Sequence, residues 1–126
     1  MGFEEKRRTP RVTLSCKVKA ETNRGTFTGQ GRDLSEGGMG VYLKKLPTVD
    51  STVTVRFELP RGENPIEATA DVRYLHREGP GVHDDWMGIK FTRMATACQK
   101  TIKAYVRENY DASKPHVPGL PPLAKP

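Results

Sequence analysis

The chain has 126 residues, a formal net charge of +6 and a sequence pI near 9.5, which fit one domain with its own core and favour anionic partners. It contains no apolar run near the ~20 residues of a membrane span and no apolar centre of a signal peptide, so we expect a cytoplasmic protein without membrane insertion. Cys16 and Cys98 show no CxxC spacing and the three histidines no metal-ligand spacing, so we expect no disulfide, metal or cofactor.

Residues 1–11 are predicted to form a flexible N-terminal arm, which Pro10 keeps from being a helix interior. The arm carries the densest basic cluster of the chain, Lys6, Arg7, Arg8 and Arg11. Arginine suits a guanine nucleotide because its planar fork matches both phosphate oxygens and the guanine O6/N7 edge. The Arg-x-x-x-Arg spacing of Arg7 and Arg11 is weak evidence alone, since Arg73 and Arg77 repeat it.

Residues 12–91 alternate apolar and polar side chains with period two, which predicts strands. The strong candidates are 12–20, 52–59, 66–76 and 86–91, and the weaker ones are 26–34 and 39–43. Six half-buried strands with short connections favour an all-β, six-stranded antiparallel barrel over a sandwich, because closure removes the exposed edges. Gly29 and Gly31 would allow a bulge or bend. The alternation points Tyr74 and His76 inward and Trp86 outward.

After Phe91 the apolar period lengthens to three or four residues, which predicts a C-terminal amphipathic helix across one barrel opening. Thr96 and Gln99 could form a capping box, or Thr92 could start the helix one turn earlier. The folded unit is then residues 12–110. Residues 111–126 are rich in proline and predict a disordered tail. Pro118 and Pro121 form a PxxP string that suits a partner, although an inert tail is favoured.

The segment Asp33-Leu34-Ser35-Glu36-Gly37-Gly38 combines a carboxylate, a hydroxyl and a glycine pair between two predicted strands. The Asp33 carboxylate could accept hydrogen bonds from the N1–H and N2–H₂ edge of guanine. Ser35 could bond a phosphate or the nearby backbone, and Gly37 and Gly38 allow a tight turn and close approach of the chain. An ordinary turn would also use these residue types, so the segment alone does not decide.

Catalytic patterns are missing from the sequence. It shows no Ser-His-Asp set, no paired-carboxylate spacing and no phosphate-binding P-loop. We therefore expect a protein that is not an enzyme.

At Arg7, Arg11, Asp33, Ser35 and Gly38 the chain resembles the PilZ domain family, bacterial receptors for cyclic di-GMP. The family carries an Arg-x-x-x-Arg arm before its first strand and an [Asp/Asn]-x-Ser-x-x-Gly motif between its second and third strands. The segment 87–91 before the helix also looks like the family's last strand. The resemblance covers roughly residues 4–110.

The resemblance implies a six-stranded antiparallel barrel with a C-terminal helix, whose arginine arm closes on cyclic di-GMP. It implies that Arg7 and Arg11 hold guanine and phosphate, that Asp33 reads a guanine edge, and that Ser35 and Gly38 shape the turn. The complete predicted cyclic di-GMP site is Arg7, Arg8, Arg11, Asp33, Ser35, Gly37 and Gly38. Arg32, Arg73 and Arg77 are second-tier candidates, and Trp86 could stack on a base or partner.

The implied function is a single-domain second-messenger receptor or adaptor that regulates bacterial motility or surface behaviour. Closure of the arm would change the surface offered to a downstream protein partner. Two alternatives stay open at this stage. One is a PilZ-like interaction module that binds no nucleotide. The other is a small nucleic-acid-binding barrel, which is disfavoured because few outward aromatic residues interleave with the basic ones.

Overall fold

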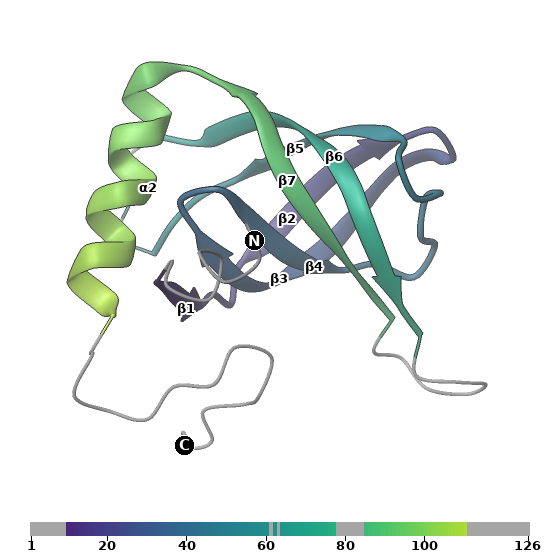
Figure 1. Cartoon of the computed structure of the whole chain (residues 1–126), viewed down its shortest axis with the longest axis horizontal. Helices are drawn as coiled ribbons and strands as arrows, with labels where there is room; N and C mark the ends of the chain where they lie inside the picture. Colours follow the sequence, from purple (N-terminus) through teal and green to yellow (C-terminus); the bar gives the residue numbers. More distant parts are fainter. Residues whose placement is uncertain (1–9, 61, 63, 78–84, 111–126) are drawn as a thin grey trace, which may run out of the picture.

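The computed structural model describes residues 10–60, 62, 64–77 and 85–110. Within them the chain forms seven strands followed by one helix (Figure 1). The elements are β1 (Arg11–Thr13), β2 (Lys17–Thr22), β3 (Gly25–Ser35), β4 (Gly38–Tyr42), β5 (Thr52–Phe57), β6 (Ile66–His76), β7 (Trp86–Met94) and α2 (Thr96–Asn109).

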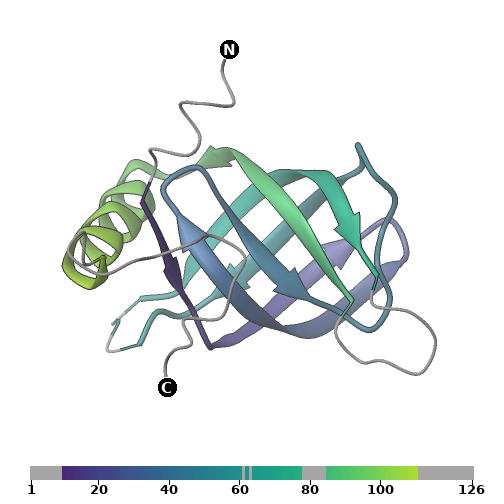
Figure 2. The ribbon, with the colours of Figure 1, turned by 60° about the horizontal axis from the view of Figure 1, so that its bottom comes forward.

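Six of these strands close into a barrel (Figure 2). Around the ring they follow the order β3, β2, β5, β6, β7, β4, and β4 pairs with β3 again to complete it. Every pairing is antiparallel. The short strand β1 is additional and pairs with the end of β3. The predicted six-stranded antiparallel barrel with a C-terminal helix is confirmed.

The first predicted strand, 12–20, is divided into β1 and β2. The division faces a bulge in β3, where the pairing with β4 shifts between Gly31 and Asp33. β2 pairs with β3 up to Gln30, and β1 resumes the pairing at Asp33. The bulge therefore leaves Arg32 as an extra residue and separates the two pairing segments. It also turns the side chain of Asp33 toward the outer face, over β4.

A second bulge changes the phase of β6. Val72 pairs with Ile89, but Tyr74 pairs with Gly88, so the register shifts between Val72 and Tyr74. From this point the alternation is inverted: Tyr74 is 50% exposed, His76 is exposed and Leu75 is half-buried. The prediction that Tyr74 and His76 point inward is wrong, because one inserted residue moves the following side chains to the other face.

The helix α2 lies at one end of the barrel and packs against β1 and β3 (Figures 1 and 2). Ile102 and Val106 are its buried residues and join the core cluster of the barrel. The predicted amphipathic helix is confirmed, but its predicted capping box is not. Ala95 is the N-cap and supplies no side-chain bond, while the Gln99 side chain donates to the Met94 carbonyl at 3.1 Å.

The arm up to residue 9 and the tail 111–126 lie outside the described residues, so their predicted properties remain predictions. Within the described part of the chain, no helix has the length and apolar character needed to cross a membrane.

Candidate functional site

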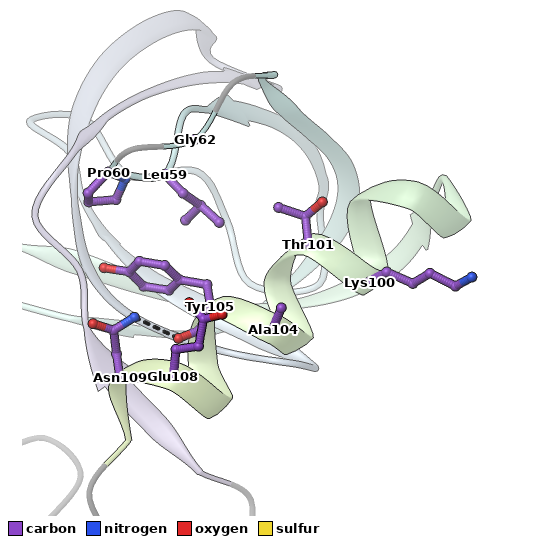
Figure 3. Close-up of a pocket in the computed structure, with 9 residues that line it drawn as sticks. All are labelled: Leu59, Pro60, Gly62, Lys100, Thr101, Ala104, Tyr105, Glu108 and Asn109. Carbon is purple, nitrogen blue, oxygen red and sulfur yellow. Dashed lines mark hydrogen bonds between the residues drawn. The ribbon is translucent and has the colours of Figure 1, made fainter.

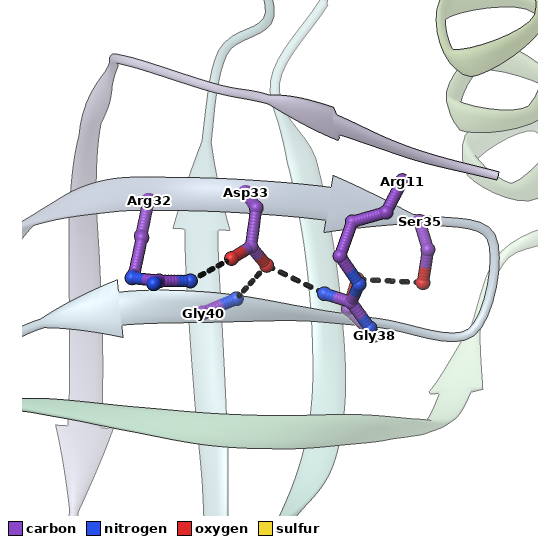
Figure 4. A network of polar contacts seen from close by, with 6 residues as sticks. All are labelled: Arg11, Arg32, Asp33, Ser35, Gly38 and Gly40. Atoms are coloured by element: carbon purple, nitrogen blue, oxygen red, sulfur yellow. Dashed lines mark hydrogen bonds and ion pairs between the residues drawn. The ribbon is translucent and has the colours of Figure 1, made fainter. Parts of the chain in front are cut away.

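Asp33 is the centre of a polar network on the outer face of β3 (Figure 4). Its carboxylate lies between two guanidinium groups, with Arg11 Nη1 2.5 Å from Oδ1 and Arg32 Nη1 2.5 Å from Oδ2. The backbone N–H of Gly40, on β4, donates to Oδ1 at 3.1 Å. Two charge-assisted bonds and one backbone bond hold this carboxylate in a fixed orientation.

The register of the short strand explains how Arg11 reaches Asp33. In β1, Arg11 pairs with Ser35 and Thr13 pairs with Asp33, so Arg11 is the diagonal neighbour of Asp33 on the same face. Arg32 reaches the other oxygen because it is the bulged residue directly before Asp33. The three side chains are 30%, 17% and 11% exposed for Arg11, Arg32 and Asp33 respectively. Because it contains two cations and one anion, the cluster carries an excess positive charge, and its side chains are largely shielded from solvent.

The hydrogen bonds on Asp33 leave limited capacity for a ligand. A carboxylate oxygen has two lone pairs, and those of Oδ1 are used by Arg11 and the Gly40 N–H. Oδ2 accepts from Arg32. A ligand that presents two parallel donors needs one acceptor position on each oxygen. It can bind in this way only after a guanidinium has moved away from Oδ1.

Ser35 and Gly38 shape the turn between β3 and β4. The Ser35 hydroxyl donates to the Gly38 carbonyl at 3.3 Å, and Ser35 itself is buried. Gly38 faces the neighbouring strand: a Cβ there would lie 2.2 Å from the Ile89 carbonyl oxygen of β7. Gly37 is different, because a Cβ there would meet no atom of the described part of the chain within 4 Å. Gly38 thus allows the backbones of β4 and β7 to approach closely. Its assignment to the ligand site stays a prediction.

The structure brings together four predicted site residues: Arg11, Asp33, Ser35 and Gly38. Gly37 lies in the same turn, where its carbonyl accepts from the Phe91 N–H at 2.8 Å. Arg7 and Arg8 lie outside the described residues. Their assignment to the site stays a prediction.

Sequence reasoning ranked Arg32 as a second-tier candidate and named Trp86 as a possible stacking residue, but it missed Tyr74 and His76 beside them. The Arg32 guanidinium carbon lies 4.0 Å from the centre of the half-buried Trp86 ring. The rings of Tyr74 and His76 each lie 5.4 Å from the Trp86 ring. The position of Arg32 directly before Asp33 in the sequence could have identified it as a site residue. The aromatic group was hidden, because the β6 bulge that brings Tyr74 and His76 outward leaves no mark in the period-two pattern.

A groove of about 700 Å³ lies elsewhere, between α2 and the segment that follows β5 (Figure 3). Among its described lining residues only Lys100 and Glu108 are charged, and both come from α2. It does not gather several cations as a dianionic ligand requires. The described residues also contain no group of three or more His, Cys, Asp or Glu side chains that could hold a metal ion.

Among the residues that the structure describes, Cys16 is the group with a clearly shifted pKa. Burial of its half-buried thiol raises that pKa from 9.0 to about 11. At pH 8 the folded protein should therefore hold about 100-fold less thiolate at Cys16 than the unfolded chain, and alkylate about that much more slowly. This difference is measured as the rate at which iodoacetamide labels Cys16 in a Cys98→Ala variant, once in the folded protein and once in protein unfolded by urea. The folded rate should rise with pH toward about 11, and equal rates in the two states would contradict the burial.

A family model described as PilZ domain matches residues 5–108 of this chain. No curated protein matches it. Among solved structures, the chain is similar to the inhibitor of motility MotI/DgrA of Bacillus subtilis, with a TM-score of 0.69 and 19% identity. That alignment covers 80% of this chain and 49% of the Bacillus protein, so the chain spans about half of that neighbour's length.

Two further structures share the fold. The PilZ domain of YcgR from Escherichia coli, solved with cyclic di-GMP, has a TM-score of 0.64 and 13% identity, covering 81% of this chain and 89% of that one. The PilZ domain of CeSA from a cellulose-synthesizing bacterium has a TM-score of 0.54 and 20% identity. The alignment covers 78% of this chain and 95% of the CeSA domain. At such identities the likeness is one of fold.

Proposed function

Because the chain belongs to the PilZ domain family, we propose that it is a receptor for cyclic di-GMP that acts through a protein partner. PilZ domains are receptor or adaptor modules rather than enzymes. The observation that carries the proposal is the Asp33 carboxylate, which lies on the outer face of β3 between Arg11 and Arg32. This cluster offers an acceptor for a guanine edge and cations for phosphates within one small area.

Guanine binding at Asp33 involves an exchange of partners. The N1–H and N2–H₂ donors of guanine need one lone pair on each carboxylate oxygen, whereas Oδ1 is already saturated by Arg11 and the fixed Gly40 N–H. Arg11 is the group that moves, because it is more exposed than Arg32 and belongs to a strand of three residues. Once released, its guanidinium is free to take a phosphate oxygen of the same ligand.

The arm supplies the remaining contacts in this proposal. Arg7 and Arg8 precede Arg11 by a few residues, so closure of the arm brings further guanidinium groups onto the phosphates. Ser35 and the turn through Gly37 and Gly38 hold the two strand ends in place. No metal or organic cofactor is needed for such binding.

The output of binding is a changed surface near the turn. A groove of about 450 Å³ borders Glu36 and Gly37 and is lined by Arg93, Lys100 and Lys103 among others. If the arm becomes ordered beside this turn, it changes the surface at the edge of the groove, where a protein partner would bind. The Bacillus neighbour is named as an inhibitor of motility, which supports control of motility as the process concerned.

The arm is tested by calorimetric titration of cyclic di-GMP into the intact chain and into Arg7→Ala. We expect Arg7→Ala to bind about tenfold or more weakly, because one charge-assisted phosphate bond is lost. Arg24→Ala is the matched control, since Arg24 lies in the turn at the opposite end of β3 and should leave the affinity unchanged.

Equal affinities of Arg7→Ala and the intact chain would remove the arm from the site. If the intact chain itself shows no binding, the receptor function fails, and a PilZ-like interaction module becomes the better description. Salt-sensitive binding of random oligonucleotides in place of cyclic di-GMP would instead support the small nucleic-acid-binding barrel.

A further inference from the structure

Two glycines form a strip on the outer face of the barrel that the side chains of Asp33 and Tyr74 cover. Gly40 of β4 and Gly88 of β7 are direct cross-strand partners. Both point outward, since their neighbours Met39, Val41, Met87 and Ile89 are buried. Because the two glycines carry no side chains, the Asp33 carboxylate lies directly over Gly40 and the Tyr74 ring directly over Gly88, and both glycines are buried.

The strip has a carboxylate on one side and an aromatic ring on the other. A Cβ on Gly40 would lie 3.2 Å from Asp33 Oδ1, and a Cβ on Gly88 would lie 2.3 Å from Tyr74 Cζ. The Asp33 carboxylate and the far end of the Tyr74 ring therefore lie over two Cα atoms only about 5 Å apart. That separation is of the order of one purine base.

The Tyr74 ring is held from the side and open to solvent. Its plane meets that of Trp86 at 80°, with ring centres 5.4 Å apart, an edge-to-face contact. Trp86 in turn packs on the Arg32 guanidinium, which bonds Asp33 Oδ2. A continuous set of contacts thus joins Tyr74 to Asp33, and yet Tyr74 remains 50% exposed.

We propose that the base recognised by Asp33 stacks on Tyr74, so that the nucleotide site extends from the β3–β4 turn over Gly40 and Gly88 to β6. This inference rests on the proposed function. The guanine directs its N1/N2 edge to the Asp33 carboxylate above Gly40, and its face stacks on the side of the Tyr74 ring that points away from Gly88. Trp86 is a positioning residue, which keeps Tyr74 and Arg32 in place while Arg11 leaves.

Stacking of a base on an aromatic ring contributes enough binding free energy for its loss to be measured. Removal of such a ring typically weakens binding of a base by about 5- to 150-fold. We therefore expect Tyr74→Ala to bind cyclic di-GMP at least about tenfold more weakly in calorimetry. Tyr74→Phe keeps the ring and should bind within about twofold of the intact chain. Tyr110→Ala removes another partly exposed tyrosine, at the end of α2, and should also have no effect.

A second variant reaches the same ring without deleting it. In Gly88→Ala the new Cβ collides with the distal atoms of Tyr74, an exposed side chain that can turn away at little cost to folding. The ring then leaves the strip, and binding should weaken about tenfold while circular dichroism shows an unchanged fold. Trp86 is the single tryptophan of the chain, so its emission reports on the site in the unaltered protein.

The outcomes separate this inference from the proposed function. Quenching of Trp86 emission by cyclic di-GMP, together with weaker binding by Tyr74→Ala and Gly88→Ala, supports the stacking position. If the intact chain binds but both variants bind within about twofold of it, or Trp86 emission stays constant at saturation, the stacking position is wrong and the receptor function stands. Failure of the intact chain to bind overturns both.

Discussion

Asp33→Ala should weaken binding of cyclic di-GMP by about 100-fold or more, because it removes both acceptor oxygens that face the guanine edge. Each bond from a guanine donor to the carboxylate is charge-assisted and lies at a site where Asp33 is only 11% exposed. The loss of two such bonds is worth roughly 3 kcal/mol or more. Calorimetric titration measures the effect, with thermal unfolding as the check that the barrel is intact.

Asp33→Asn is the sharper companion to this variant. It retains the shape of the side chain and an acceptor for the Gly40 N–H, but presents an amide donor where guanine also presents donors. We expect a smaller loss of affinity than in Asp33→Ala, and a smaller change in stability, because the amide keeps one acceptor oxygen. Binding by Asp33→Ala within about threefold of the intact chain would show that the base is recognised elsewhere.

Gly38→Ala should destabilise the folded chain by about 1–3 kcal/mol or more, although it adds a single methyl group. Its Cβ would lie 2.2 Å from the Ile89 carbonyl oxygen and 3.4 Å from the Lys90 Cα, both backbone atoms of β7. A side chain could rotate away from such a contact, whereas a strand cannot. The first residue of β4 would have to separate from β7, and the barrel would open at that seam. Urea denaturation gives the change in unfolding free energy.

Gly37→Ala provides the control at the adjacent position. No atom of the described residues lies within 4 Å of a Cβ there, so its cost should stay within about 0.5 kcal/mol. If Gly37→Ala and Gly38→Ala unfold at the same urea concentration, the assigned role of Gly38 as the point of close approach between β4 and β7 is contradicted.

The regular part of the fold could be predicted from the sequence. Val53, Val55 and Phe57 alternate with polar residues and are all buried, as period two requires. The change of period after Phe91 likewise predicted α2, whose buried residues Ile102 and Val106 are four positions apart. In these segments local pattern and tertiary packing agree.

The irregular part could not be predicted, since it depends on pairing between distant strands. The bulge between Val72 and Tyr74 is set by the register of β6 against β7, and it inverts every side chain that follows. The bulge at Arg32 is set in the same way by β4. The sequence gives no sign of the bulge before Tyr74, whereas Gly31 indicated that a bulge was possible in β3 without fixing its position.

The candidate site shows the same division. Its residues Arg11 and Asp33 were identified from motif and chemistry, but as two separate contacts to a ligand. Their ion pair follows from the pairing of Arg11 with Ser35, which only the assembled sheet reveals. The glycine pair was likewise unrecognisable, because Gly40 and Gly88 are neighbours in the barrel and far apart in the chain.

The most direct test of this account is a calorimetric titration of the intact chain with cyclic di-GMP and, in parallel, with cyclic di-AMP. Adenine lacks the N2 amine and offers an acceptor at N1, so it cannot give Asp33 two donors. We predict that cyclic di-GMP binds with a Kd below about 0.1 mM and that cyclic di-AMP binds at least about 100-fold more weakly. Absence of binding by cyclic di-GMP, or equal affinity for the two dinucleotides, would contradict recognition of guanine at Asp33.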